Sequence, residues 1–164
     1  MKKPTPDFRA ILQTLLKHQV DFIVVGGVCG VLHGAPINTF DLDIVHSRKP
    51  RNIGRLERAL HALDARYRTP GHENLRAGRA HLASAGHQLL MTEAGPLDLL
   101  GTIGKGYEYD DLVPETIELD IGRGSKVRLL DLPALIRIKA ETAQEKDKAQ
   151  LIVLRRTLQE KSKP

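Results

Sequence analysis

Two aspartates, two residues apart, are the clearest candidates for chemistry in this sequence. Asp41 and Asp43 alternate with apolar residues, and this period of two predicts a half-buried strand. Both carboxylates then leave one face, roughly 6–7 Å apart along the strand, while Phe40, Leu42 and Ile44 point into the core. Like charges this close repel each other unless a cation lies between them, and an all-oxygen pair favours a hard ion such as Mg²⁺.

A third carboxylate stands in another apolar stretch. Asp98 has leucines on both sides, and an acid in so apolar a strand needs a reason. If this strand lies beside the one that carries Asp41 and Asp43, three carboxylates converge. Such a cluster is the arrangement used for two-metal phosphoryl or nucleotidyl transfer. The alternative is that the acids are surface positions on an edge strand.

A pair of glycines precedes this motif. Residues 21–25 are apolar and β-branched, which predicts a buried strand that ends at Gly26 and Gly27, and a short helix is expected over residues 28–33. Backbone without side chains lets amide groups approach phosphate oxygens closely. The alternative is a tight turn without a ligand. The spacing does not fit Gly-x-Gly-x-x-Gly, so the pair is not a dinucleotide fingerprint.

Helices and further strands are expected to position these residues. A first helix is predicted to take Thr5 as its cap and Pro6 as its first residue. Residues 66–86 show no period and are expected to contain a mobile loop. The other expected elements are helices over 53–63, 131–139 and 146–158 and strands over 88–92, 97–100, 116–121 and 126–130. This order predicts an α/β (α+β) fold, a mixed sheet flanked by helices, in a single domain over residues 1–164.

Composition excludes several classes of protein. The chain has 164 residues, 4% aromatics and no tryptophan, so an aromatic platform for single-stranded nucleic acid is not expected. The single cysteine, Cys29, excludes an internal disulfide and a cysteine-cluster zinc site. No apolar stretch approaches the ~20 residues of a membrane span, and the N-terminus lacks an apolar signal core. A cytoplasmic protein with no membrane partner is expected.

Positive charge gathers between residues 48 and 87. This stretch holds nine Lys or Arg and three Asp or Glu, a net charge of +6 in a chain whose total is +5. A local excess of this kind suits a polyanion such as RNA, a nucleotide or a phosphorylated substrate. The alternative is a solvated basic face without a partner.

A late lysine also attracts attention. Lys139 falls on the apolar stripe of the predicted helix, with Leu132, Leu135 and Ile136, and a lysine on an inward face requires an anionic partner such as a carboxylate or a phosphate. If the helix continued, Asp147 would extend the same stripe. The alternative is that Lys139 reaches solvent along its own stem and Asp147 is a surface acid.

The central motif resembles that of a known superfamily. Gly26-Gly27, thirteen intervening residues and then Asp41-Leu42-Asp43 resemble the signature of the DNA polymerase beta-like nucleotidyltransferases. The segment from Gly34 to Ile44 is similar to the small bacterial branch, which includes stand-alone proteins and the toxins of toxin–antitoxin pairs. The similarity covers about residues 20–155, the expected core of the domain. It continues through Leu97-Asp98-Leu-Leu-Gly, Tyr109-Asp110-Asp111-Leu112, Val127-Arg128-Leu-Leu-Asp131-Leu, Leu135-Ile136-x-x-Lys139 and Lys146-Asp147.

The resemblance implies an activity and a role for each matching residue. It implies transfer of a nucleoside monophosphate from an NTP to an acceptor hydroxyl, with two Mg²⁺ ions as cofactors. Asp41, Asp43 and Asp98 would be the metal ligands and catalytic residues, and Asp98 would help to activate the acceptor hydroxyl. The nucleotide would contact residues from several parts of the chain. These are Gly26, Gly27, Thr39, Lys139 and Asp147.

One departure from the branch leaves a second function open. The branch usually carries an arginine shortly before its Thr-x-Asp-x-Asp segment, where this chain has Ile37 and Asn38. Its loss favours, as the alternative, a weakly active or inactive module that binds nucleotide or RNA, or a toxin–antitoxin component. The acceptor is left open between an RNA end, a protein and a small molecule, and the basic stretch over residues 48–87 favours RNA. Because the chain leaves little room for a separate acceptor-binding domain, a partner protein or a homodimer is a further expectation.

Overall fold

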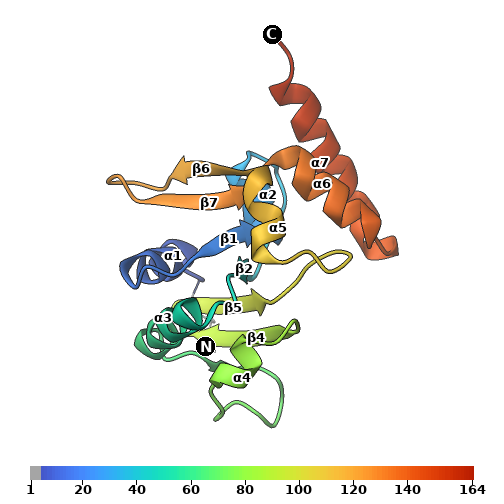
Figure 1. The fold of residues 1–164 in the computed structure, drawn as a ribbon. Coiled ribbons are helices and arrows are strands. Elements are labelled where there is room, and N and C mark those ends of the chain that lie inside the picture. Colours follow the sequence, from blue (N-terminus) through green and yellow to red (C-terminus); the bar gives the residue numbers. More distant parts are fainter. Residues whose placement is uncertain (1–4) are drawn as a thin grey trace.

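Seven strands form one mixed sheet in the computed structural model, which describes residues 5–164 (Figure 1). The strands follow one another across the sheet in the order β3-β4-β5-β2-β1-β7-β6. Their bounds are β1 Phe22–Val25, β2 Leu42–His46, β3 Arg66–Tyr67, β4 His87–Thr92, β5 Gly95–Leu100, β6 Thr116–Asp120 and β7 Lys126–Leu130.

The sheet mixes parallel and antiparallel pairs. β1 runs antiparallel to β2 and parallel to β7, and β2 runs parallel to β5. Two hairpins, β4–β5 and β6–β7, extend the sheet on its two sides. All four residues of β1 are buried, as expected for a central strand that is covered on both faces. The α/β fold class predicted from the sequence is confirmed.

Helices lie on both sides of the sheet (Figure 1). α1 and α3 pack against each other, and α6 packs against α7 and α2. Their bounds are α1 Phe8–Lys17, α2 Gly26–Leu32, α3 Pro50–Ala62, α4 Arg79–Leu82, α5 Tyr109–Leu112, α6 Leu132–Glu141 and α7 Lys148–Lys161, with 3₁₀ turns at Val113–Glu115 and Glu145–Asp147. Within residues 5–164, every helix is too short or too polar to span a bilayer.

Two local expectations are wrong. Asp7, not Thr5, caps the first helix, because its carboxylate accepts a hydrogen bond from the Ala10 amide at 3.0 Å. Phe40 is 77% exposed rather than in the core, because β2 begins only at Leu42 and the alternation does not extend back to residue 40. Residues 66–86 also contain two short elements, β3 and α4, which the absence of a period did not predict.

Candidate functional site

Three carboxylates meet at the start of β2. Asp43 lies opposite Asp98 in the β2–β5 register, so the two side chains leave the same face of adjacent parallel strands. Asp41 stands just before β2. Each of these aspartates offers an oxygen that lies within 4.8 Å of the others. From the sequence, the three carboxylates were expected to converge if their strands were neighbours. The two strands are neighbours, and the carboxylates do converge.

The apolar neighbours of the acids anchor this geometry. On the opposite face of the same two strands, Leu42, Ile44, Leu97 and Leu99 are fully buried. Because side chains alternate along a strand, burial of these four residues fixes the carboxylates on the other face. Asp98 is itself only 7% exposed, so the cluster sits partly out of water.

The surroundings of the cluster disfavour the ionised forms of Asp41 and Asp43, and their pKa values are raised. Burial, followed by the nearby charges of Asp98 and Asp41, raises the pKa of Asp43 to about 8. Burial and a hydrogen bond with Asp98 also raise the pKa of Asp41. A divalent cation among these oxygens would offset the mutual repulsion that adds to the effect of burial on both pKa values. The donor set, oxygen alone, is the one that Mg²⁺ prefers.

An arginine that the sequence did not single out reaches into this cluster. The Arg68 guanidinium donates to Asp98 Oδ1 at 2.5 Å through Nη1 and approaches Asp41 Oδ2 at 3.4 Å through Nη2. Nη1 also donates to the Leu90 carbonyl at 2.9 Å. A hydrogen bond to Asp98 is the main cause that raises the pKa of Arg68. The site therefore contains one fixed positive charge against three carboxylates.

The pairing of β3, β4 and β5 explains how the Arg68 side chain reaches Asp98. The Arg68 amide donates to the Leu89 carbonyl at 3.1 Å, one residue beyond β3, and Leu89 is opposite Asp98 in the β4–β5 register. Two strand spacings amount to about 10 Å, a gap that an extended arginine and an aspartate can close together. The local sequence around Arg68 is aperiodic and carries no signal of this contact.

The glycine pair is packed against the acids. Gly26 has φ +67°, and a Cβ there would collide with the Asp43 carboxylate. A Cβ at Gly27 would lie 2.6 Å from Thr39 Oγ1, whose hydroxyl donates to the Asp41 carbonyl at 3.1 Å. The glycines begin α2 rather than end a turn before it. Both are required for the close approach of α2 to the motif.

Lys139 and Asp147 form an ion pair of their own. Their Nζ and Oδ1 atoms are 3.5 Å apart, and each side chain is about one-quarter exposed. α6 ends at Glu141, so the two residues do not share one continuous helix stripe, and a 3₁₀ turn brings Asp147 back instead. Asp147 is thus the anionic partner that the inward lysine needs. Asp147 is not a member of the group of three aspartates, and the contact of the pair with nucleotide remains a prediction.

Six of the nine basic residues in the stretch have an acidic partner. Acidic partners lie within 4.0 Å of Arg48, Lys49, Arg66, Arg68, Arg76 and Arg79. Among residues 5–164, no such ion pair forms for the three arginines of α3, which are Arg51, Arg55 and Arg58. The positive surface is therefore smaller than the sequence count suggests.

Two hollows are lined by sequence or contact neighbours of the three aspartates, although not by the aspartates themselves. One, of about 430 Å³, has Arg68, Tyr67 and Met91 among its lining residues. The other, of about 510 Å³, is mainly apolar and is lined in part by Phe40, Met91 and Pro96. Pro96 leaves the same face of β5 as Asp98, two residues away, so this apolar hollow lies beside the carboxylates.

Comparison with known proteins places the fold. No family model and no curated protein matches the sequence. A Thermotoga maritima protein provisionally described as a nucleotidyltransferase, TM1012, aligns with a TM-score of 0.55 and 17% identity over 93% of this chain and 91% of its own. Two structures of the antibiotic-resistance factor ANT(2'')-Ia, one in complex with adenylyl-2''-tobramycin, give TM-scores of 0.57 and 0.58. Their identity is 17%, and the alignments cover 92% of this chain and 82% and 87% of theirs.

The class of fold follows from these alignments. This chain has the nucleotidyltransferase fold, as its motif predicted. The likeness extends over nearly the whole length of the chain and is not confined to the strands around the acids. At this identity the likeness concerns the fold, and the chemistry has to be argued from the chain's own residues.

Proposed function

We propose that this protein is a Mg²⁺-dependent nucleotidyltransferase, which moves a nucleoside monophosphate from an NTP to an acceptor hydroxyl. The observation that carries the proposal is the meeting of Asp41, Asp43 and Asp98 on adjacent strands of a nucleotidyltransferase fold. The alternative from the sequence was that these acids are surface positions on an edge strand. The structure does not support it, because β2 and β5 are interior strands and Asp98 is buried.

The residues present fit a divalent metal. Three carboxylate oxygens lie within 4.8 Å of one another, and burial together with mutual repulsion raises the pKa of Asp43 to about 8. Asp41, Asp43 and Asp98 would therefore hold the metal. When bound, Mg²⁺ would supply Lewis acidity toward the acceptor hydroxyl and the triphosphate oxygens.

The protein's own groups then have defined tasks. Asp98, the most buried of the three acids, would orient the acceptor hydroxyl and receive its proton. Gly26 and Gly27 let the start of α2 pack directly against Asp43 and Thr39, and their backbone amides would contact the phosphate oxygens of the nucleotide. Thr39 fixes the Asp41 backbone through its hydroxyl. Lys139 would add positive charge for the triphosphate once it leaves Asp147.

A small-molecule acceptor suits the surroundings better than RNA. The apolar hollow beside Asp98 offers a concave binding site of ordinary ligand size. An RNA acceptor would depend on the basic stretch, in which most side chains already have acidic partners. The ANT(2'')-Ia complex shows that a protein of this fold binds an adenylylated small molecule.

Transfer of label from the α-phosphate tests the proposal. Each NTP, labelled at this position, is incubated with the protein and Mg²⁺ in the presence of a small-molecule extract, total RNA or total protein. We expect labelled product that disappears with EDTA and with Asp43→Asn. Labelled product that persists in Asp43→Asn contradicts this mechanism.

A non-catalytic module is the second candidate, because the branch's usual arginine is replaced by Ile37-Asn38. Calorimetric titration of each NTP with and without Mg²⁺ separates the two functions. Magnesium-dependent NTP binding followed by labelled product supports the enzyme. Nucleotide or RNA binding that is indifferent to metal, with no product from any acceptor pool, supports the module.

A further inference from the structure

We propose that Arg68 is a tethered counter-cation that occupies the carboxylate cluster before the metal and exchanges with it. This inference rests on the proposed function, because it assumes that Asp41, Asp43 and Asp98 are the metal ligands. No sequence motif predicts this role of Arg68 as a counter-cation.

The contacts of Arg68 support exchange. Its guanidinium engages one oxygen of Asp98 and one of Asp41, two of the three groups that would hold the ion. Mg²⁺ binds carboxylate oxygens at about 2.0–2.1 Å. A guanidinium at hydrogen-bond distance from the same oxygens then lies close to a double positive charge, and the two cations repel each other.

The tether makes the exchange reversible. The Arg68 backbone is bonded to β4 through Leu89, so displacement moves the side chain and leaves the strand in place. The side chain is 26% exposed and borders the 430 Å³ hollow, which gives it room to move. A displaced guanidinium therefore remains beside the site and can return when the metal leaves.

This arrangement has a consequence for metal loading. Without a counter-cation, three carboxylates in a partly buried site would repel one another and strain the sheet. Arg68 relieves this repulsion but lowers the affinity for a free divalent ion. A metal that arrives with a triphosphate brings its own negative charge and is opposed less. Arg68 thus favours entry of the metal together with its nucleotide.

Charge removal at Arg68 tests the proposal without any measurement of activity. Mn²⁺ is titrated into wild type, Arg68→Met and the matched control Arg66→Met, and free Mn²⁺ is followed by electron paramagnetic resonance without nucleotide. Arg66 lies two residues away and pairs with Asp64, not with the cluster. We expect Arg68→Met to bind Mn²⁺ about tenfold more tightly, since a unit charge ~6 Å from a divalent ion costs this much even in a water-like dielectric. Arg66→Met should match wild type.

The outcomes separate this inference from the proposed function. Equal or weaker Mn²⁺ binding by folded Arg68→Met, with saturable binding by wild type, overturns the exchange alone. Absence of saturable binding in both overturns the metal site as well. Arg68→Gln removes the charge but keeps hydrogen-bond donors, and it replaces Arg68→Met if circular dichroism shows that Arg68→Met does not fold. A purely structural role would lower stability without raising Mn²⁺ affinity.

Discussion

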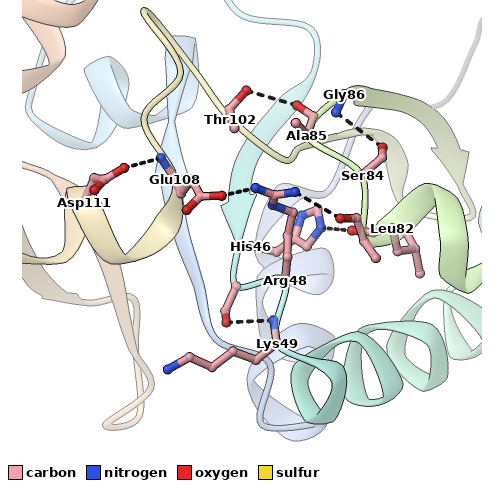
Figure 2. Close-up of polar contacts among 12 residues, drawn as sticks. His46, Arg48, Lys49, Leu82, Ser84, Ala85, Gly86, Thr102, Glu108 and Asp111 are labelled. Carbon is pink, nitrogen blue, oxygen red and sulfur yellow. Dashed lines mark hydrogen bonds and ion pairs between the residues drawn. The ribbon is translucent and has the colours of Figure 1, made fainter.

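The two ends of β2 carry arginine-containing clusters with opposite charge balance. At the first end, Arg68 faces Asp41, Asp43 and Asp98, and the carboxylates outnumber the cation. At the last end, Arg48 pairs with Glu108 (Figure 2). Arg48 also donates to the Ala83 carbonyl at 3.0 Å. One cluster is left with unbalanced charge in a partly buried place, and the other is neutral.

The balanced end ties separate elements together. Figure 2 shows His46 and Arg48 directed toward the chain around Leu82, and Glu108 between Arg48 and Asp111. His46 Nε2 lies 2.7 Å from the Leu82 carbonyl, so this nitrogen carries the proton. The Glu108 amide donates to Asp111 at 2.9 Å, part of the cap of α5. These contacts connect β2, α4 and α5 and stabilise the fold.

The comparison separates stability from function. Groups that satisfy one another contribute to folding, whereas like charges held together by surrounding apolar packing cost stability and suit a ligand of opposite charge. Both clusters contain an arginine from the same basic stretch, so residue type alone does not distinguish them. Their partners do, and changes at each end should have different effects.

The largest effect is expected from Asp43→Asn. This change removes one ligand charge from the centre of the unbalanced cluster and keeps the side-chain shape. Transfer of labelled nucleotide should fall by about a thousandfold or more, comparable to the loss of a main electrostatic group in other active sites. Circular dichroism should show an intact fold. Activity within tenfold of wild type would remove Asp43 from the proposed mechanism.

Gly26→Ala should disturb the same end through shape. The new Cβ meets the Asp43 carboxylate, and the backbone has φ +67°, so we expect a loss of about 2–3 kcal/mol in unfolding free energy together with loss of transfer. Gly124→Ala is the matched control, because it has φ +76° but no heavy atom within 4 Å of the new Cβ. It should lose only about 1 kcal/mol. Denaturant unfolding of both variants measures the difference, and equal losses would contradict a clash at Asp43.

The unbalanced end should also make metal-free stability depend on pH. The folded pKa of Asp43 is about 8, above the ordinary value of about 3.9 in an unfolded chain. The folded state therefore binds more protons between these values, and its stability falls as pH rises from about 4 to about 8.

Thermal unfolding in EDTA across this range measures the effect. Asp43→Asn should show a smaller decline than wild type, because its amide does not titrate. The difference between the two proteins isolates Asp43 from the buried histidines, whose lowered pKa values have the opposite sign of effect. Parallel pH curves would contradict a raised pKa at this position.

The smallest effect is expected at the balanced end. Arg48→Met removes the pair with Glu108, which is about half exposed, so we expect a loss of about 1 kcal/mol. Mn²⁺ affinity should stay at the wild-type value, in contrast to Arg68→Met. Denaturant unfolding and Mn²⁺ titration check both statements. A change in metal affinity would show that the two ends of β2 are not independent.

Much of the fold could be predicted from local sequence. β7 and the core of β1 and β2 follow apolar runs, and the β6–β7 hairpin surrounds the expected glycine-rich turn. The prediction failed where tertiary contacts, and not the local sequence, determine the structure. Phe40 continues an apolar alternation but lies before β2 begins. The ion pair of Lys139 with Asp147 forms across the break between α6 and the next 3₁₀ turn, and not along one helix. Neither the start of β2 nor this ion pair produces a hydrophobic period in the sequence, so neither could be predicted from the local pattern.

The three aspartates of the site could be predicted from the sequence, but the arginine that pairs with them could not. Asp41, Asp43 and Gly26 are close in sequence and share a motif, and Asp98 stands out because its neighbours are apolar. Arg68 reaches Asp98 only because β3, β4 and β5 are adjacent in the sheet. The need for a cation beside the carboxylates follows from charge alone and was predicted from the sequence. Which of nine basic residues supplies it depends on strand order and register.

Equilibrium binding of Mn²⁺ to wild type, Asp43→Asn and Asp98→Asn tests the central claim most directly. The claim is that these carboxylates, which lie within 4.8 Å of one another, form one cation site. Free Mn²⁺ is measured by electron paramagnetic resonance, with circular dichroism as the check on folding. We expect saturable binding to wild type and at least about tenfold weaker binding to each folded variant, because each loses a ligand charge. Equal affinity in all three proteins would contradict the metal site and the nucleotidyl transfer built on it.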